Sequence, residues 1–504
     1  MISKIKGVFG EKVSPALEAL LESNVLPKYR ILVIFWLVGL YLLGSVGFAF
    51  FFNWGNYDMQ YSDWANITGP RLQFLTSSLR GGQLPLQISD SMTFQWVTYR
   101  YLAVADAFIP PQYVLLYWLP ISTFVLVDVW LLYSLGFIGL LFLRRKLRLS
   151  LVSFTALFLL FNFNGHILAH YSVGHATWGG YFLFPWYAWL IFRLLEGDHS
   201  WLWTTLMSVL LFIIWLQGSF HLFLYLLILL GLIGVFIPRH FWTMIKTGLI
   251  TFLVCAFRLL PCILTFQQFK LSFINGFPSL WSIWDNLVNL PDWQASPFFL
   301  HQMLGLPLGE WELTYFIGLV GALFLIIFGF YRGLFHRESP YRALLAPLGI
   351  MLLLSLGFVF NAVQALPIPL IQGERATSRI FSVVLVFGLI LAAERFQRWL
   401  DTSPQKMLSL TSGLLGLAFI AFDLWQDFRI WQVTNRDPTA WLKFDPLKWY
   451  VKNNLSDMRY IGLVFGGLAI SLLTILILGG ISLEEHRQKK QALLPVEDQS
   501  IQAV

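Results

Sequence analysis

Apolar runs of about twenty residues, the length that crosses a hydrocarbon core of about 30 Å as a helix, recur from Ile31 to Gly479. Only 12% of the 504 residues are charged and the mean hydropathy is +0.67, whereas soluble proteins carry roughly 25% charged residues. The runs are continuous rather than alternating, which excludes a transmembrane β-barrel. The sequence therefore predicts an all-α polytopic membrane protein.

The apolar runs predict about twelve transmembrane helices at the bilayer-spanning length. A basic cluster, "RRKLR" (Arg144–Arg148), follows the second run and marks the cytoplasmic side, because short cytoplasmic loops carry an excess of Lys and Arg. This assignment places both termini in the cytoplasm. The expected spans lie near residues 31–52, 120–143, 150–165, 177–194, 201–218, 220–237, 244–265, 313–331, 342–360, 379–394, 407–423 and 460–479.

The chain divides into a cytoplasmic amphipathic N-terminal segment (1–30), a single transmembrane unit (31–480) and a cytoplasmic tail (481–504). Three outside loops within the transmembrane unit are too long to be plain turns, and long loops without a purpose are uncommon. All three are rich in Trp and Tyr, which favour the membrane interface. We expect them to form a cap with interfacial helices over the outer end of the spans: 53–119, 267–312 and 424–458.

Charge and cysteine content restrict the function classes. The net charge of +7 follows from basic residues in the short loops, so it does not indicate a nucleic-acid partner. Cys255 and Cys262 lie seven residues apart in one expected helix, about 10 Å at a rise of 1.5 Å per residue, which is too far for a disulfide. No nucleotide-binding loop, dinucleotide fingerprint, haem motif or CxxC pair is present, which argues against ATP-driven and redox roles.

The stretch "QYSDWANITGPRLQFLTSSLRGG" (60–82) contains a candidate interfacial helix after an acid. Its leucines recur at three- and four-residue spacing between Gly69-Pro70 and Gly81-Gly82, which indicates one apolar helical face. Arg71 falls on the opposite, polar flank. Such a helix would hold Asp63 beside the membrane, where a lipid-anchored substrate presents its head group. Asp58, five residues earlier, is the alternative, and a solvated loop acid is the other interpretation of both.

A second candidate cluster is "NGHILAHYSVGHATWGG", with His166, His170 and His175. His166 and His170 are four residues apart and share a helical face. A zinc site would require a third ligand, so a hydrogen-bonding role in a polar cavity is the alternative. The pairs Gly165-His166 and Gly174-His175 indicate broken helix ends, which membrane proteins tolerate where they line a cavity.

Acids and arginines next to expected spans form the remaining candidates. Glu310 and Glu312 in "LPLGEWELTYFIG" directly precede a span, where buried acids require a cation or a basic partner; exposure at the interface is the alternative. Arg375 and Arg379 in "IQGERATSRIF" share a helical face at a helix start, an arrangement suited to a phosphate. Arg258, in "CAFRLLPCI", is an intramembrane charge and by default a functional or paired residue.

Taken in order along residues 30–400, these pieces resemble the type-C (GT-C) integral membrane glycosyltransferases, most closely the YfhO-like bacterial branch. The resemblance rests on "YSDWANITGPRLQFLTSSLRGGQLP", on the GH turn followed by "LFPWYAWL", on "EWELTYFIG" and on "GERATSRIF". It implies an enzyme of the bacterial cytoplasmic (inner) membrane that serves the cell envelope. Such an enzyme moves a sugar from a polyprenyl-phosphate lipid to a saccharide or lipid acceptor at the outer face.

The resemblance also implies roles for the candidate residues. Asp63, with Asp58 as the fallback, corresponds to the family's acid in the first outside loop and would act as general base towards the acceptor hydroxyl. Arg375 and Arg379 would bind the phosphate leaving group. The other expected substrate contacts are Arg258, His166, His175 and Arg71. Glu310 or Glu312 would bind a divalent cation, Mg or Mn, or position the acceptor. Asp63 lacks the adjacent second acid of many relatives, so metal dependence stays open.

Two other functions share the same sequence features. A lipid-linked saccharide transporter or flippase would also use many spans and a cationic cavity, but it should show inverted repeats, and the sequence has no convincing pair. A non-catalytic membrane subunit of a larger complex is the other alternative. The expected functional charges concentrate on the outer face, which favours the enzyme over the transporter.

Overall fold

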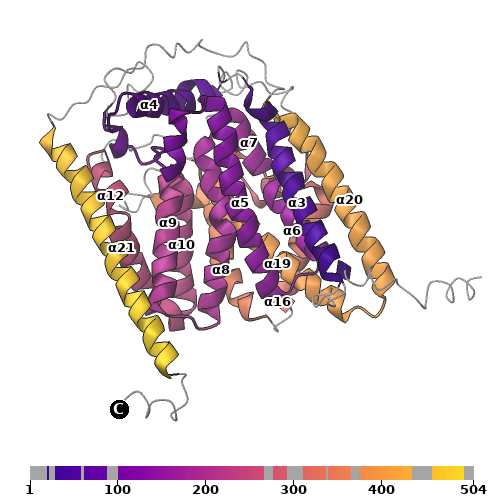
Figure 1. Ribbon diagram of the computed structural model, residues 1–504. Helices are drawn as coiled ribbons and strands as arrows, with labels where there is room; N and C mark the ends of the chain where they lie inside the picture. The colour runs from indigo at the N-terminus through magenta and orange to yellow at the C-terminus, as the bar shows by residue number, and fades with distance from the viewer. Residues whose placement is uncertain are drawn as a thin grey trace, which may run out of the picture.

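The computed structural model describes residues 20–21, 29–57, 59, 62–87, 100–265, 276–291, 310–335, 339–364, 374, 376–433 and 457–492. Within these ranges the chain is almost entirely helical and contains no β-strand; only two isolated β-bridges occur, Gln87 with Arg100 and Phe277 with Leu356. The helices stand side by side, and most of them run between the two ends of the molecule (Figure 1). The predicted all-α class is confirmed.

Seven helices in the described part of the chain are long and apolar enough to cross a bilayer, or eight if one bent pair counts as a span. The bent pair is Phe220–Phe236 with Pro238–Val254, which turns by 116°. Other apolar segments form shorter or interrupted helices. The seven are Arg30–Phe51 (α3), Ile121–Leu147 (α5), Leu151–Val173 (α6 and α7), Gly318–Phe335, Thr377–Thr402, Lys406–Trp431 (α20) and Met458–Gln491.

The two interior candidate spans form the centre of the bundle. Leu151–Val173 and Thr377–Thr402 are buried throughout their apolar windows, whereas less than a third is buried in α3, α20 and Met458–Ala492 (α21). Figure 1 accordingly shows α21 at one side of the bundle and α3 with α20 at the other. The outer helices expose large apolar side chains such as Phe35 (72%) and Leu476 (72%). A bilayer would cover these side chains, because soluble proteins rarely expose large contiguous apolar patches.

The remaining helices complete the bundle and its connections. They are Phe184–Leu195 (α8), Trp201–Leu216 (α9), Phe220–Phe236 (α10), Phe241–Val254 (α11), Ala256–Cys262 (α12), Leu280–Val288 (α13), Leu345–Leu354 (α17) and Gly357–Gln364 (α18). The candidate span Gly318–Phe335 contains Gly318–Phe324 (α15) and Arg332–Phe335 (α16), and the candidate span Thr377–Thr402 contains Phe381–Thr402 (α19). Cys255 and Cys262 are buried free thiols, as their spacing predicts.

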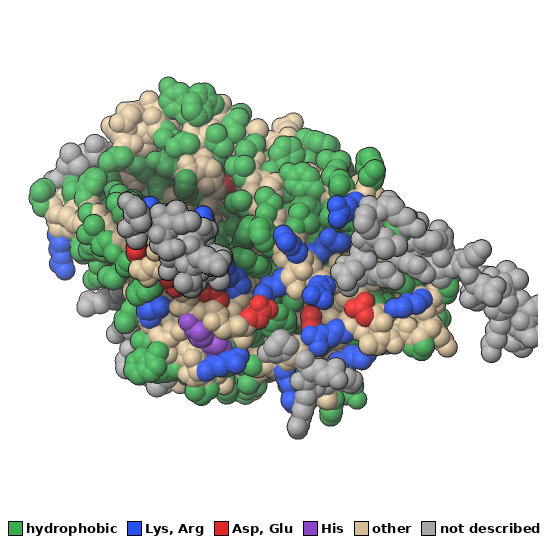
Figure 2. Space-filling view, turned by 60° about the horizontal axis from the view of Figure 1, so that its bottom comes forward, with side chains coloured by type: hydrophobic (Ala, Val, Ile, Leu, Met, Phe, Trp, Pro, Cys, Tyr) green, Lys and Arg blue, Asp and Glu red, His purple; other side chains and the backbone are tan. Residues whose placement is uncertain are grey.

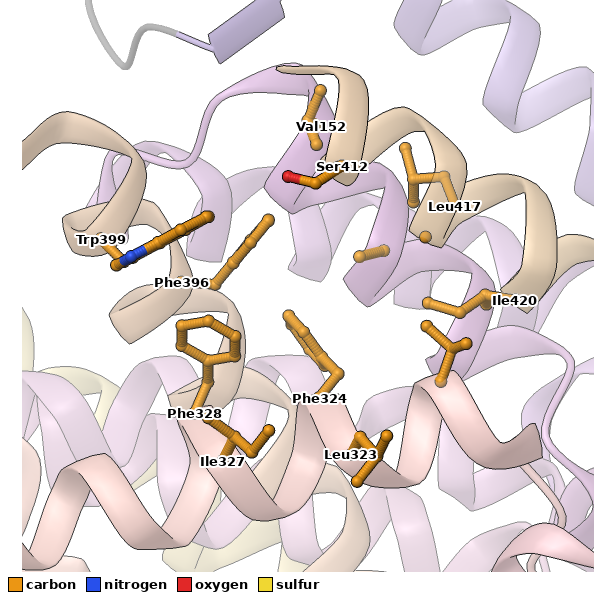
Figure 3. A pocket seen from close by; sticks show the side chains of 14 residues that line it. Val152, Leu323, Phe324, Ile327, Phe328, Phe396, Trp399, Ser412, Leu417 and Ile420 are labelled. Atoms are coloured by element: carbon orange, nitrogen blue, oxygen red, sulfur yellow. The ribbon is translucent and has the colours of Figure 1, made fainter. Parts of the chain in front are cut away.

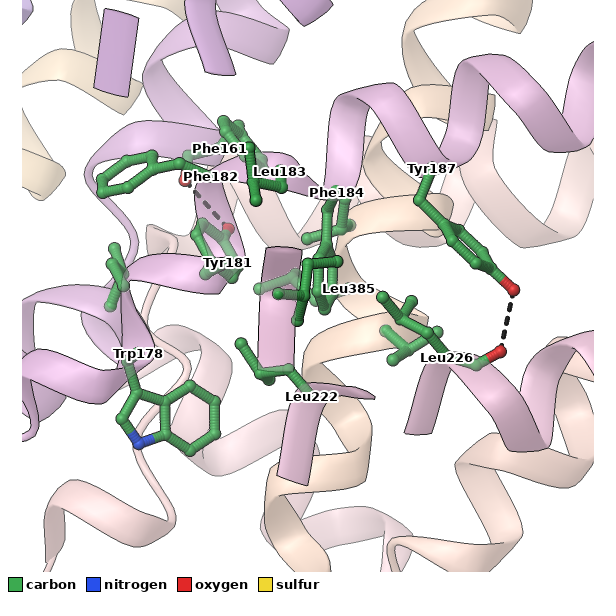
Figure 4. Packing of buried hydrophobic residues seen from close by; sticks show 14 of the residues in the cluster. Phe161, Trp178, Tyr181, Phe182, Leu183, Phe184, Tyr187, Leu222, Leu226 and Leu385 are labelled. Carbon is green, nitrogen blue, oxygen red and sulfur yellow. Dashed lines mark hydrogen bonds between the residues drawn. The ribbon is translucent and has the colours of Figure 1, made fainter. Parts of the chain in front are cut away.

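Aromatic and aliphatic side chains fill the interior around the central helices. Figure 4 shows Tyr187 and Leu385 among these residues. The Tyr187 hydroxyl donates to the carbonyl of Leu226 at 2.8 Å, and the Tyr181 hydroxyl donates to the carbonyl of Phe161 at 2.9 Å. Buried phenols usually require such partners. These bonds connect the region after α7 to α6 and connect α8 to α10, so they fix the frame in which α7 lies.

An apolar cavity of about 240 Å³ lies between α6, α15 with the π-helix Leu325–Tyr331 (η10), α19 and α20. Figure 3 shows Phe324, Phe328 and Phe396 pointing into it. The lining carries one hydroxyl, Ser412, and no charge. The cavity therefore has no polar group suited to chemistry and plays no part in the candidate site.

At one end of the bundle Gly69–Arg80 (α4), which belongs to the loop expected outside, lies across the helix ends (Figure 1). The helix predicted between the two glycine-containing pairs is thus present. Arg71, which was expected on the polar flank, is however only 5% exposed, whereas Arg80 at the end of the helix is exposed as expected. The reason is that α4 packs into the rest of the cap, where its apolar Phe74 contacts the ring of Tyr101 at 4.9 Å.

Helix lengths differ from the expected boundaries in the last third of the chain. Helix α20 continues to Trp431, beyond the expected span end at 423 and into the expected loop 424–458. Helix α21 continues to Ala492, so the expected tail from 481 onward begins as helix. Of the N-terminal segment, only Leu20 and Leu21 belong to the described residues before 29, and the side-chain amide of Gln397 donates to the carbonyl of Leu21 at 3.0 Å.

Candidate functional site

The backbone around Asp63 adopts an unusual conformation. Ser62 has a left-handed φ of +49°, and a short π-helix, Trp64–Thr68 (η3), runs directly into α4. A left-handed φ is strained for serine, and π-helical turns are rare. Asp63 thus lies between a left-handed residue and a π-helical turn.

Gly174 packs against this irregular backbone. It has a φ of +107°, and a Cβ atom at this position would lie 2.2 Å from the amide nitrogen of Trp64 and 2.7 Å from the carbonyl carbon of Asp63. Only glycine permits such an approach. The indole of Trp64 also donates to the carbonyl of Ser172 at 3.1 Å, and Thr68 donates to the carbonyl of Gly174. The segment Trp64–Thr68 and the end of α7 are thereby joined at the site.

Asp63 and two histidines form a hydrogen-bonded row. The Nε2 atom of His175 lies 2.6 Å from Oδ2 of Asp63, and the Nδ1 atoms of His175 and His170 are 2.5 Å apart. The side chains are 29% exposed for Asp63, 12% for His175 and 0% for His170. The row thus begins at a partly open carboxylate and leads into the interior. Sequence analysis placed Asp63 and His175 among the site residues but did not predict their contact.

Gly165–Val173 (α7) carries the inner histidines, and both predicted helix breaks are present. The helix begins after Asn164, whose side chain accepts from the amide of Ile167, and ends at left-handed Gly174. The rings of His166 and His170 are 4.4 Å apart, as their shared face predicts. His166 stacks on Tyr315 at 4.1 Å, and His170 stacks on Trp178 at 4.0 Å. These rings hold the imidazoles in fixed orientations.

A buried ion pair closes the inner end of the row. Both oxygens of the Glu312 carboxylate accept from Arg379, one of them from Nε at 2.6 Å, and His170 Nε2 lies 4.0 Å from Glu312. The guanidinium also lies over the ring of Trp178 at 5.6 Å. Glu312 thus has the basic partner that the sequence required of a buried acid. Arg379 is correspondingly engaged with a protein carboxylate.

A second polar cluster lies at the start of α10 and was missed by sequence reasoning. Nδ1 of His221 lies 2.7 Å from Glu374, the hydroxyl of Tyr225 donates to the same oxygen at 2.7 Å, and the amide of Ala376 donates to the other at 2.9 Å. Burial disfavours ionisation of Glu374, but His221 and Arg379 outweigh it and lower the pKa of Glu374 to about 2. A polar residue at the start of an apolar run was the available signal for His221.

Arg71 and Arg258 both bond to other parts of the protein in this structure. Arg71 forms a two-pronged ion pair with Asp106, at 3.0 Å for each bond. Burial opposes ionisation of Asp106, yet Arg71 holds its pKa below the ordinary value. Arg258 is fully buried and donates to the carbonyls of Leu102, Val104 and Ala105. Both arginines thus anchor the segment that ends at Asp106.

Three predicted site residues lie outside the described part of the chain: Asp58, Arg375 and the side chain of Glu310. Among the residues that are described, no three His, Cys, Asp or Glu side chains are arranged to hold a metal ion. His166 and His170 contact aromatic rings and each other in this structure, and the cation role of Glu310 stays a prediction.

Comparisons with protein-family models, with curated proteins and with solved structures each found no match to this chain.

Proposed function

We propose that the protein is a GT-C-type membrane glycosyltransferase that moves a sugar from a polyprenyl-phosphate-linked donor to an acceptor hydroxyl at the outer face of the membrane. The proposal includes about twelve spans at the length a bilayer requires, with both termini in the cytoplasm of a bacterial cell. It rests on the order of sequence features given above and on one structural observation. That observation is the partly exposed Asp63 carboxylate held by His175 at the end of the bundle that carries α4.

The chemistry assigns a proton transfer to Asp63. The acceptor hydroxyl loses its proton to the carboxylate while its oxygen attacks the anomeric carbon of the sugar. The bond between the anomeric carbon and the phosphate oxygen breaks, and polyprenyl phosphate leaves with the electron pair. One carboxylate oxygen, Oδ2, contacts His175, so the approach of the acceptor is assigned to Oδ1. Asp58 remains the fallback for the same role.

The leaving phosphate requires positive charge beside it. We assign this role to Arg375, one residue after Glu374. Arg379 supports phosphate binding by Arg375 indirectly, because the bonds of Arg379 to Glu312 fix the turn just before α19. The Arg379–Glu312 pair has no net charge, so Arg379 alone is a weaker phosphate ligand than the sequence suggests.

A transporter or flippase of lipid-linked saccharides is the second candidate. The observation that favours it is the number of interrupted helices: α6 breaks before α7, and the pair formed by α10 and the segment Pro238–Val254 turns by 116°. Discontinuous helices are typical of transporters. The row of Asp63, His175 and His170 lies towards one end of the bundle, which favours the enzyme.

One experiment distinguishes the glycosyltransferase from the transporter. Purified protein in lipid nanodiscs, which allow no transport, is incubated with a set of polyprenyl-phosphate sugars and lipid or saccharide acceptors, and the products are detected by mass spectrometry. The enzyme forms a glycosylated acceptor and free polyprenyl phosphate. If no donor yields product, while sealed proteoliposomes move the labelled lipid between leaflets, the transporter function replaces the proposed one.

A further inference from the structure

A polar cavity of about 270 Å³ lies at the end of the bundle where α5 and α19 end. Its charged and polar lining comes from separate elements and includes Lys146, Arg148, Tyr341, Glu394, Arg398 and Asp401. We call it the basal cavity. Figure 2 turns this end of the molecule forward and shows Lys and Arg side chains gathered there together with Asp and Glu side chains. The candidate functional site does not use any of these residues.

The lining of the basal cavity is held in place by hydrogen bonds. Glu196 accepts from Lys146 at 2.5 Å and from the hydroxyl of Tyr341 at 2.7 Å, which joins α5 to the segment before α17. Gln397, also in the lining, accepts from the amide of Ser150 at 2.8 Å and donates to Asp401 at 2.9 Å. These bonds therefore fix the inner part of the lining around Gln397, whereas Arg148, Arg398 and Asp401 lie at its exposed rim.

The charges around the basal cavity balance. Lys146, Arg148 and Arg398 contribute three positive charges, and Glu394, Asp401 and the adjoining Glu196 contribute three negative charges. Arg398 pairs with Glu394 at 2.5 Å, whereas no ion pair is formed by Arg148 within the described residues. Asp401 likewise forms no ion pair within the described residues, so a ligand that carries one charge of each sign can pair with Arg148 and Asp401 and leave the sum of charges unchanged.

The position of the basal cavity along the helices indicates that its ligand comes from the membrane. Lys146 belongs to the last turn of α5, and Arg398 and Asp401 belong to the last two turns of α19; both helices are long enough to span a bilayer. The ends of spanning helices lie at the level of the lipid head groups. The basal cavity therefore faces the head groups of the leaflet opposite the one next to α4.

We propose that the basal cavity binds the head group of a zwitterionic aminophospholipid such as phosphatidylethanolamine. Arg148 and Lys146 bind the phosphate, and Asp401 binds the ammonium group. This site is independent of the proposed transfer reaction, which takes place at the other end of the bundle. The bound head group connects α5, α19 and the segment before α17.

Native mass spectrometry of the delipidated full-length protein tests the site with three probes: phosphatidylethanolamine, phosphatidylglycerol and soluble glycerophosphoethanolamine. We expect phosphatidylethanolamine to bind best. Arg148→Gln and Asp401→Asn should each weaken its binding by about tenfold, or about 1.4 kcal/mol, the low end for a charge-assisted hydrogen bond. Arg145→Gln is the matched control, because Arg145 is exposed in the same helical turn but does not line the cavity.

Each alternative outcome contradicts a defined part of the proposal. Equal binding by the Arg148→Gln and Arg145→Gln proteins would exclude the basal cavity as the site. Equal binding of phosphatidylglycerol would exclude the role of Asp401 towards an amine. Equally tight binding of glycerophosphoethanolamine would show that the lipid chains do not contribute. The substituted side chains are surface-exposed, so unchanged unfolding midpoints are expected and should be verified.

Discussion

The buried pair of Glu312 and Arg379 provides the sharpest energetic prediction. Their side chains are 3% and 7% exposed and share two hydrogen bonds. Removing one partner of a buried ion pair leaves a charge without compensation, which costs about 3–5 kcal/mol. We therefore expect Glu312→Gln to lower the free energy of unfolding by about 3 kcal/mol. The measurement is equilibrium unfolding in mixed micelles with increasing dodecyl sulfate, followed by tryptophan fluorescence.

A double-mutant cycle with Arg379→Met completes this test. Removing both charges should cost less than the sum of the single changes, by about 2 kcal/mol, because neither charge is then left alone. Lys489→Gln is the control, since its pair with Glu485 is exposed at 62% and 25% and should contribute only about 0.3–0.5 kcal/mol. A cost below about 1 kcal/mol for Glu312→Gln, within the range of an exposed pair, would refute the assignment of a buried, mutually dependent pair.

Three further predictions concern the frame of the site. Gly174→Ala should destabilise the protein by about 1–3 kcal/mol more than Gly197→Ala, since Gly197 has a similar φ of +100° but nothing within 4 Å of its Cβ position; equal costs would contradict the close packing on Trp64. Arg258→Met should lower the unfolding midpoint, because it removes charged hydrogen bonds worth about 1.5–3 kcal/mol each; an unchanged midpoint would argue against the anchoring role. The pKa of Glu374 is about 2 in the folded protein against 4.5 ordinarily, so its stabilising effect is present above pH 4.5 and lost as the pH falls towards 2. The difference in free energy of unfolding between wild type and Glu374→Gln should therefore shrink as the pH falls from 5 to 3. A difference that grows over this range would contradict the lowered pKa of Glu374.

Much of the fold follows from the length and continuity of the apolar runs. The same runs did not reveal where helices break, except at the GH pairs flanking α7. The span expected at 244–265, for example, is divided into α11 and α12 near Cys255. Such breaks depend on partners distant in the sequence: the amide of Phe257 at the start of α12 donates to Ser471 on α21 at 2.9 Å. Periodicity within one segment carries no information about those partners.

The site was predictable in its residue types but not in its pairings. Asp63 and His175 were singled out separately, and only the folded chain brings them within 2.6 Å across 112 residues. Arg71 was expected on the polar flank, but it is buried and pairs with the partly exposed Asp106. Arg379 was expected to bind a phosphate, and Glu310 or Glu312 a cation or the acceptor; the contact between Arg379 and Glu312 was not predicted. Charged residues can be identified as functional candidates from their membrane context, whereas the choice of partner requires the tertiary structure.

The most direct test of the proposed function is the turnover of Asp63→Asn in the nanodisc transfer assay. Asparagine keeps the shape of the side chain but cannot take the hydroxyl proton, so turnover should fall by roughly 10²–10⁴-fold, the usual contribution of a general base. Asp285→Asn, which changes an exposed acid on α13, should leave turnover unchanged. Turnover by Asp63→Asn equal to that of wild type would contradict the assignment of Asp63 as the base.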